Sequence, residues 1–204
     1  MESAGTWVAF IATRNERGDP DVPPGGRLDR YRVDEVRVIT GESPAIDAGW
    51  QMARVESPKP VPPLFWDRRL EGVTAHLEYT NAAEKADLAR ASTGERQPRA
   101  VLIPITKSAE WWAMAQDERQ AHFRKSAARE GHTALGQKYS DRIYRKLYHS
   151  RYLPGSSWDF LTYFEFEAAH EADFRALLAA MRDPAVNPEW QFVERESELW
   201  LTRT

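Results

Sequence analysis

The stretch AEWWAMAQDERQAHFRKSAAREGHTALGQKYSDRIYRKLYHS, residues 109–150, is the most informative part of this chain. It contains two adjacent tryptophans, Trp111 and Trp112, then His132, and then Arg145 thirteen residues further on. Each of these residue types commonly serves in core packing or on a solvated surface. The information therefore lies in their joint order and spacing, and the rest of the chain must support or weaken it.

Composition sets broad limits on the fold and on the partners. The chain has 204 residues, which suffice for one large domain or for two small fused repeats. The net charge of −3 and the pI near 6.0 give no electrostatic reason to bind nucleic acid, so we expect no nucleic-acid partner. There are no cysteines, which excludes disulfides, iron–sulfur clusters and thiolate ligands. Histidine is the obvious metal ligand that remains.

The N-terminal residues and the hydropathy of the chain bear on its compartment. The sequence Met-Glu-Ser-Ala-Gly-Thr-Trp has neither a basic n-region nor a long apolar h-region. No segment approaches the roughly 18 apolar residues of a membrane span. We therefore expect a cytoplasmic protein that has no membrane partner.

Strand signals dominate the first half of the chain. Short apolar runs bounded by glycine and proline predict strands, and Asn81 can cap a helix. The predicted strands are 6–12, 50–55, 72–79 and 99–106, with a loop over 14–32 and a helix over about 82–92.

The second half repeats this plan with longer helices. We expect helix from about 108 to 139, with a break near Gly131, and a second helix over about 168–182. That second helix carries apolar residues at the i, i+3, i+4, i+7 spacing of a buried stripe, at Phe174, Leu177, Leu178 and Met181. The predicted strands of this half are 142–148, 158–167 and 190–202.

Recurring strand and helix signals in both halves indicate the fold class. We predict an α+β protein built of two fused ferredoxin-like repeats with antiparallel β-sheets, of the dimeric α+β barrel type. The halves would run over about 1–98 and 99–204, and we interpret the whole chain, 1–204, as a single domain.

Arg145 lies in the middle of a predicted strand, on the face that also carries Ile143 and Leu147. That placement predicts a guanidinium that points into the protein rather than into water. A buried arginine needs an anion, and two readings remain open at this point. The partner is either a carboxylate of the core or a bound anionic ligand.

The spacing around His132 resembles a known family. Tyr139 follows His132 at +7, Arg145 at +13 and His149 at +17, and the Trp111–Trp112 pair precedes it. In this arrangement the segment resembles the chlorite dismutase family, haem b proteins that convert chlorite to chloride and dioxygen, and in particular its short branch. The resemblance covers roughly residues 71–203.

The resemblance implies a cofactor, a substrate and a reaction. Haem b would be held by His132 as the iron ligand, with His149 as the rival ligand. Arg145 would be the distal arginine that orients the chlorite anion and retains hypochlorite through a ferryl/hypochlorite rebound. Glu189 would accept a hydrogen bond from the other ring nitrogen of the ligand, fixing its tautomer. Without the resemblance, Glu189 is interpreted as a solvated loop residue.

Further assignments rest on the same resemblance. Trp111 would border the haem and its propionates, and the hydroxyl of Tyr79 would reach a propionate. Lys107 could offset propionate charge, although we expect an exposed lysine there. The short branch also implies a homodimer by analogy.

Two other functions remain open. One is a coproporphyrin-haem decarboxylase, from a related family that keeps the proximal histidine but generally lacks the distal arginine, so Arg145 argues against it. The other is a non-catalytic haem-binding protein of the same fold.

Overall fold

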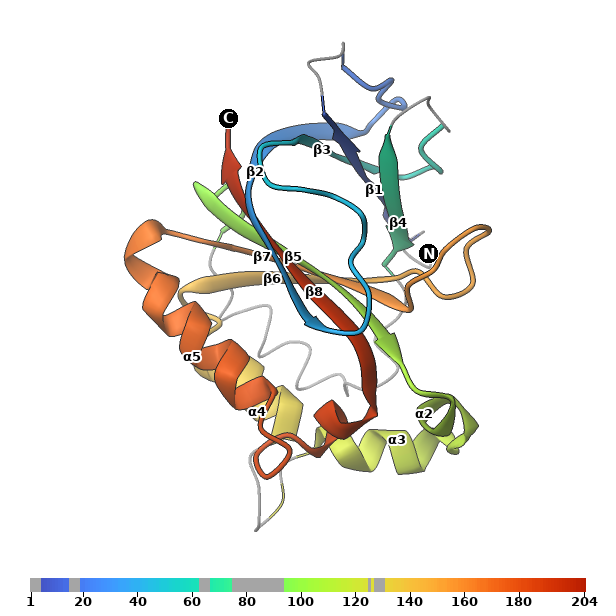
Figure 1. The fold of residues 1–204 in the computed structure, drawn as a ribbon, viewed down its shortest axis with the longest axis vertical. Helices are drawn as coiled ribbons and strands as arrows, with labels where there is room; N and C mark the ends of the chain where they lie inside the picture. The colour runs from blue at the N-terminus through green and yellow to red at the C-terminus, as the bar shows by residue number, and fades with distance from the viewer. Residues whose placement is uncertain (1–4, 15–18, 63–66, 75–93, 125, 127–130) are drawn as a thin grey trace.

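The structure, a computed structural model, describes residues 5–14, 19–62, 67–74, 94–124, 126 and 131–204. In this part of the chain, antiparallel strands close into a barrel with the order β1-β3-β2-β8-β5-β7-β6-β4 (Figure 1). The strands are β1 (Trp7–Thr13), β2 (Arg27–Thr40), β3 (Gln51–Ser57), β4 (Arg68–Val73), β5 (Arg99–Lys107), β6 (Ile143–His149), β7 (Phe160–Phe166) and β8 (Val193–Arg203). The helices are α2 (Ala109–Ala113), α3 (Gln116–Phe123), α4 (Gly131–Lys138) and α5 (Glu171–Met181), with short 3₁₀ helices η1 (Ala168–His170) and η2 (Pro188–Phe192). The fold is thus mixed α+β.

Each half of the chain contributes four consecutive strands to the barrel. In the first half the strands lie side by side in the order β4-β1-β3-β2. The second half has the equivalent order β8-β5-β7-β6, again fourth, first, third and second along the chain. The halves join at two seams. One is the long antiparallel pairing of β2 with β8, and the other is the short contact of β4 with β6 at Val73 and His149.

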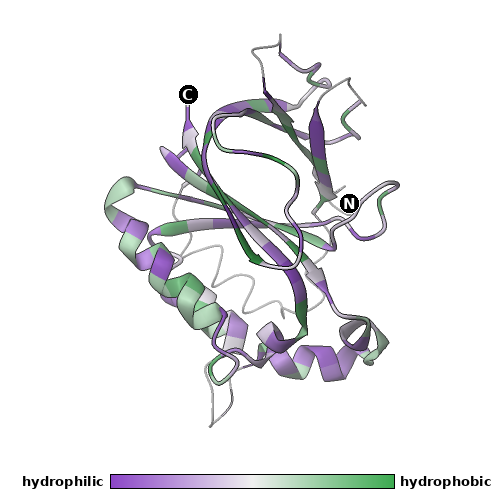
Figure 2. Cartoon of the chain, in the orientation of Figure 1, coloured by the Kyte–Doolittle hydropathy of each residue, from purple (hydrophilic) through white to green (hydrophobic). Residues whose placement is uncertain are grey.

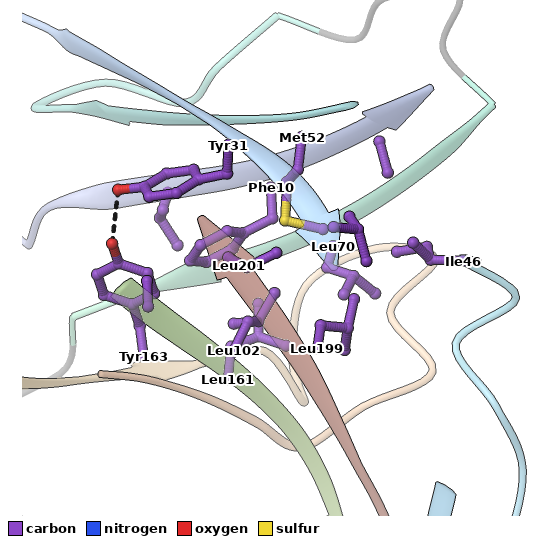
Figure 3. Close-up of a cluster of buried hydrophobic side chains, with 14 of the residues drawn as sticks. Phe10, Tyr31, Ile46, Met52, Leu70, Leu102, Leu161, Tyr163, Leu199 and Leu201 are labelled. Carbon is purple, nitrogen blue, oxygen red and sulfur yellow. Dashed lines mark hydrogen bonds between the residues drawn. The ribbon is translucent and has the colours of Figure 1, made fainter. Parts of the chain in front are cut away.

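Apolar side chains from both halves fill the barrel interior. Successive residues of a strand point to opposite faces, so every second residue of each strand reaches this core. Phe10, Met52, Leu102 and Leu199 are fully or almost fully buried there (Figure 3). The core also contains a polar contact, because the hydroxyls of Tyr31 and Tyr163 lie 2.6 Å apart.

The outer face of the second-half strands is covered by helices (Figure 1). α5 packs its apolar stripe of Phe174, Leu177 and Leu178 against β5, β7 and β8, and α4 adds Leu135. The predicted stripe is therefore confirmed. Figure 2 shows apolar and polar residues mixed along α5, as expected of a helix with one buried face, whereas α3 is mostly hydrophilic.

Several predicted elements are confirmed and others are not. The strands predicted at 6–12, 50–55, 99–106, 142–148, 158–167 and 190–202 are present as β1, β3, β5, β6, β7 and β8, with ends shifted by up to three residues. The predicted loop over 14–32 is wrong at its C-terminal end, because β2 begins at Arg27. The many charged residues of β2 give it the composition of a loop. One of them, Asp29, is buried and forms an ion pair with Arg54.

The other differences concern the helices and the end of the first half. β4 begins at Arg68, earlier than predicted. Residues 75–79 of the predicted strand and the predicted helix over 82–92 lie outside the described residues. The predicted helical stretch of 108–139 is divided into α2, α3 and α4, and the expected break near Gly131 is confirmed.

Gly131 begins α4 with a φ of +74°, a conformation that favours glycine. A Cβ atom there would lie 2.6 Å from the carbonyl oxygen of Arg124. Gly131 therefore permits the sharp entry into α4 that immediately precedes His132.

None of the helices among the described residues is both long and apolar enough to span a membrane.

Candidate functional site

A cavity lies between the outer face of the second-half strands and the helices α4 and α5. Its empty space, counted out to the open mouth, is about 710 Å³. Polar and charged residues are among those that line it, but most of the wall surface is apolar. The polar groups that the site uses are Lys107, His132, Arg145, Glu189 and Glu196.

His132 and Glu189 meet in this cavity from distant parts of the chain. His132 is the second residue of α4, and Glu189 lies in η2, just before β8. The Nδ1 atom of His132 lies 2.7 Å from Oε2 of Glu189. Glu189 is buried, 7% exposed, so its carboxylate depends on partners within the protein.

Lys107 is the second partner of Glu189, and the expectation of an exposed lysine is wrong. It is the last residue of β5, is 5% exposed, and places Nζ 2.5 Å from Oε1 of Glu189. The sequence held a signal for this burial. Because Ile103, Ile105 and Lys107 alternate along β5, they share the strand face that lines the cavity.

The charges around Glu189 and His132 determine which of the two is protonated. Burial alone would raise the pKa of Glu189, but the charges of Lys107 and His132 outweigh it and hold that pKa well below its usual range. Glu189 is therefore ionised and can only accept hydrogen bonds. Burial lowers the pKa of His132, with Glu189 opposing that shift and Arg145 and Lys107 adding to it. His132 is thus neutral at pH 7, with its proton on Nδ1 and a free lone pair on Nε2.

Arg145 lines the same cavity from β6. It passes close to α4, because a Cβ atom at Gly136 would lie 3.5 Å from its Nη1 atom. Among the residues that the structure describes, no carboxylate forms an ion pair with Arg145. Burial lowers the pKa of Arg145, and the charge of Glu189 partly opposes that shift. The guanidinium thus faces the cavity as a cation that lacks a direct anionic partner within the described chain.

The two tryptophans of α2 point to different surroundings. Trp111 is fully buried among Phe123, Phe192 and Lys107, whose Nζ lies 4.9 Å from the ring centre. Its indole N–H finds no acceptor among the described residues. Trp111 is absent from the described lining of the cavity.

The indole N–H of Trp112, in contrast, has a hydrogen-bond acceptor within the protein. Its indole nitrogen donates to Oδ2 of Asp159 at 2.9 Å, and its ring stacks on Phe160 and lies under the guanidinium of Arg151, 4.1 Å away. Its polar group is therefore engaged within the protein.

The remaining candidates lie elsewhere. Tyr79 is outside the described residues. His149 ends β6, packs edge-on against Phe160 and does not belong to the described lining of the cavity. His132 is thus the histidine that this part of the chain presents to the cavity.

Comparison with known proteins identifies the family of this chain. The profile of the chlorite dismutase family matches residues 68–194, more than half of the chain. A chlorite dismutase from Ideonella dechloratans is 34% identical over 101 residues, which are 47% of this chain and 33% of that protein. The match thus spans about a third of the length of that relative.

Solved structures extend the likeness to nearly the whole chain. The structure of a dimeric chlorite dismutase from Nitrobacter winogradskyi is 32% identical, with a TM-score of 0.74, and the match covers 96% of this chain and 99% of that one. A chlorite dismutase from Candidatus Nitrospira defluvii, solved in complex with imidazole, is 22% identical and shares the fold, with a TM-score of 0.68 over 100% of this chain and 92% of that one. This chain belongs to the chlorite dismutase family.

Proposed function

We propose that this protein is a haem b-dependent chlorite dismutase, which converts chlorite to chloride and dioxygen. The observation that carries the proposal is the pairing of His132 with Glu189 in a cavity that Arg145 also lines. That pairing leaves Nε2 of a neutral imidazole free to bind a metal, and Arg145 supplies a cation for an anionic substrate. Membership of the family supports the same activity.

The residues present fit haem b. The described residues contain no group of three or more histidine, cysteine, aspartate or glutamate side chains arranged to hold a metal ion. A porphyrin supplies most of the ligands of its iron, so the single imidazole of His132 suffices as the protein ligand. The mostly apolar wall of the cavity suits the porphyrin face.

His132 would ligate the iron through Nε2, and two further side chains would hold and tune it. Glu189 accepts a hydrogen bond from the Nδ1–H group of His132 and so fixes the tautomer and the ring orientation. Lys107 holds Glu189 in place and keeps it ionised. Haem b, when bound, supplies the redox chemistry that splits chlorite.

Arg145 would act on the anions of the reaction. Its guanidinium attracts and orients chlorite, and then retains the anionic chlorine oxide that remains after oxygen transfer until the oxygen–oxygen bond is made. A fixed cation in a pocket that excludes water stabilises such anions more than it would in bulk solvent. The overall conversion balances, because one chlorite ion yields one chloride ion and one dioxygen molecule.

The other site assignments are proposals on the same basis. Trp111 would border the haem and donate to a propionate, and Tyr79 would reach a propionate with its hydroxyl. The buried indole of Trp111, which has no acceptor among the described residues, supports its part.

We further propose that the chain, 1–204, is one domain of two ferredoxin-like repeats, about 1–98 and 99–204. The strand order that recurs in the two halves supports this organisation. We also propose a homodimer. The dimeric relative from Nitrobacter winogradskyi, which aligns over almost its entire length, supports that assembly.

Reconstitution tests the proposed function. Purified protein is titrated with haem b and should develop the Soret band of a histidine-ligated haem, and added chlorite should then release dioxygen at an oxygen electrode. Failure to bind haem would overturn the proposal entirely. Haem binding without oxygen release would overturn the enzymatic part and favour a haem-binding protein, whereas decarboxylation of coproporphyrin haem would favour the related decarboxylase.

A further inference from the structure

A second charged cluster lines the cavity beside the His132 site. Glu196 of β8 is 3% exposed and belongs to the cavity wall. It pairs across the sheet with Ile105 of β5, two residues before Lys107. Glu196 therefore stands near the end of β5 that also carries the lysine partner of Glu189.

Arg182, at the C-terminal end of α5, holds Glu196 in this position. Its Nε atom lies 3.1 Å from Oε1 of Glu196, and its Nη2 atom lies 2.6 Å from Oε1 of Glu198. The second oxygen of Glu198 accepts a hydrogen bond of 2.6 Å from the indole nitrogen of Trp200. Two buried carboxylates thus share one guanidinium.

Glu196 and Lys107 lie on the same wall of the cavity, because Glu196 pairs across the sheet with Ile105 and both side chains line the cavity. Burial raises the pKa of Glu196, while Arg182 and Lys107 oppose that shift and Glu198 adds to it. The ammonium of Lys107 therefore bonds Glu189 directly and attracts Glu196, on the same cavity wall, at longer range.

From this arrangement we infer that Glu196 is a positioning residue that acts on His132 through Lys107 and Glu189. The inference rests on the proposed function, because it concerns the haem that His132 would ligate. The negative charge of Glu196 partly offsets the positive charge of Lys107. Glu189 is then less neutralised by Lys107 and accepts a stronger hydrogen bond from the N–H group of His132. A more electron-rich imidazole and a more negative cavity both favour the ferric over the ferrous state of a bound haem.

Loss of this charge should shift the haem potential in a defined direction. In Glu196→Gln, the charge of Lys107 is no longer offset by Glu196 and neutralises Glu189 more completely. The imidazole of His132 then donates less electron density to the iron. The midpoint potential of the haem-loaded protein should become more positive. We expect about a tenfold change in the ferric/ferrous equilibrium, which is about 59 mV for a one-electron couple.

The experiment measures midpoint potentials by spectroelectrochemistry on the haem-loaded protein. Glu194→Gln, an exposed glutamate two residues earlier on β8, is the matched control and should leave the potential unchanged. Should Glu196→Gln fail to fold, Glu198→Gln removes a charge from the same cluster without altering the cavity wall, and should shift the potential in the same direction.

A second comparison tests the route through the lysine. In a Lys107→Gln background, the shift caused by Glu196→Gln should shrink. An equal shift in both backgrounds would overturn the coupling through Lys107, and no shift in either glutamate variant would overturn the inference as a whole. The proposed function fails separately, since absence of a histidine-ligated Soret band in the unmodified protein concerns haem binding and not Glu196.

Discussion

Nδ1 of His132 lies 2.7 Å from Oε2 of Glu189, a contact between the start of α4 and the residue group just before β8. Because Glu189 is ionised, this contact places the imidazole proton on Nδ1 and leaves Nε2 as a free donor atom. The ligand role, the tuning by Lys107 and the role of Glu196 all depend on this relationship.

His132→Ala should abolish tight haem binding. It removes the imidazole that the cavity presents, and the structure describes no neighbouring group that could replace it. Haem titration followed in the Soret region measures the effect. His149→Ala is the matched control and should bind haem normally, so loss of haem in that variant instead would show that the ligand is misassigned.

Arg145→Ala should keep haem but lose most of the oxygen release. Removing one electrostatic stabiliser of a reacting anion typically lowers the rate by about 10²–10³. The variant should also release more hypochlorite and bleach sooner, which a hypochlorite trap and the decay of the Soret band would measure. Arg142→Ala removes a partly exposed guanidinium just before β6 and should leave the rate intact. Equal rates in both variants would contradict the role of Arg145.

Lys107→Met should destabilise the protein strongly. Glu189 would then be a buried carboxylate that has lost its only ammonium partner among the described residues, and breaking a buried ion pair from one side costs about 3–5 kcal/mol. Urea unfolding of the haem-free protein measures the loss. The double variant Lys107→Met/Glu189→Gln should recover part of it, and a double variant as unstable as the single one would argue against the pair.

The stability of the haem-free protein should fall as the pH drops below about 6.5, the ordinary pKa of histidine. Burial lowers the pKa of His132, so in that range the unfolded chain binds a proton that the folded chain does not. Stability from this source is complete above the unfolded pKa and is lost as the pH falls towards the folded one. Urea unfolding at a series of pH values should show a flatter dependence for His132→Gln than for the unmodified protein.

Gly131→Ala should weaken both stability and haem binding, because the new Cβ meets the carbonyl of Arg124 at the residue before the ligand. A residue other than glycine at positive φ already costs about 1–2 kcal/mol. Gly155→Ala is the control, since Gly155 has a φ of +75° but no atom within 4 Å of the new Cβ. If the two variants lost equal stability, the close approach at Gly131 would have no consequence.

The sequence predicted those features that depend on local pattern. Alternation along the second-half strands and the spacing of apolar residues in α5 are set by backbone periodicity, and the structure contains them as β5, β6, β7, β8 and α5. The same alternation predicted that Arg145 points into the protein, and Arg145 lines the cavity on the outer face of the sheet. β2 was missed because its charged residues resemble a loop until their partners on other strands, such as Arg54 for Asp29, are known.

Contacts between distant elements were beyond sequence reasoning. The alternation along β5 places Lys107 on the buried strand face, but its partner Glu189 is known only from the fold, in which η2 lies over the end of β5. The Arg182 cluster requires the end of α5 to lie beside β8, which no local pattern of the chain encodes. Trp111 and Trp112 are adjacent in sequence, yet only the packed structure shows that their indoles have different surroundings.

The central claim is that a haem held at His132 and a cation at Arg145 together convert chlorite to chloride and dioxygen. Oxygen release from a known amount of chlorite by the haem-reconstituted protein tests it most directly, with chloride measured in the same sample. We predict equal amounts of dioxygen and chloride, each equal to the chlorite consumed. Consumption of chlorite that yields no dioxygen, or a haem-loaded protein that leaves chlorite intact, would contradict the account.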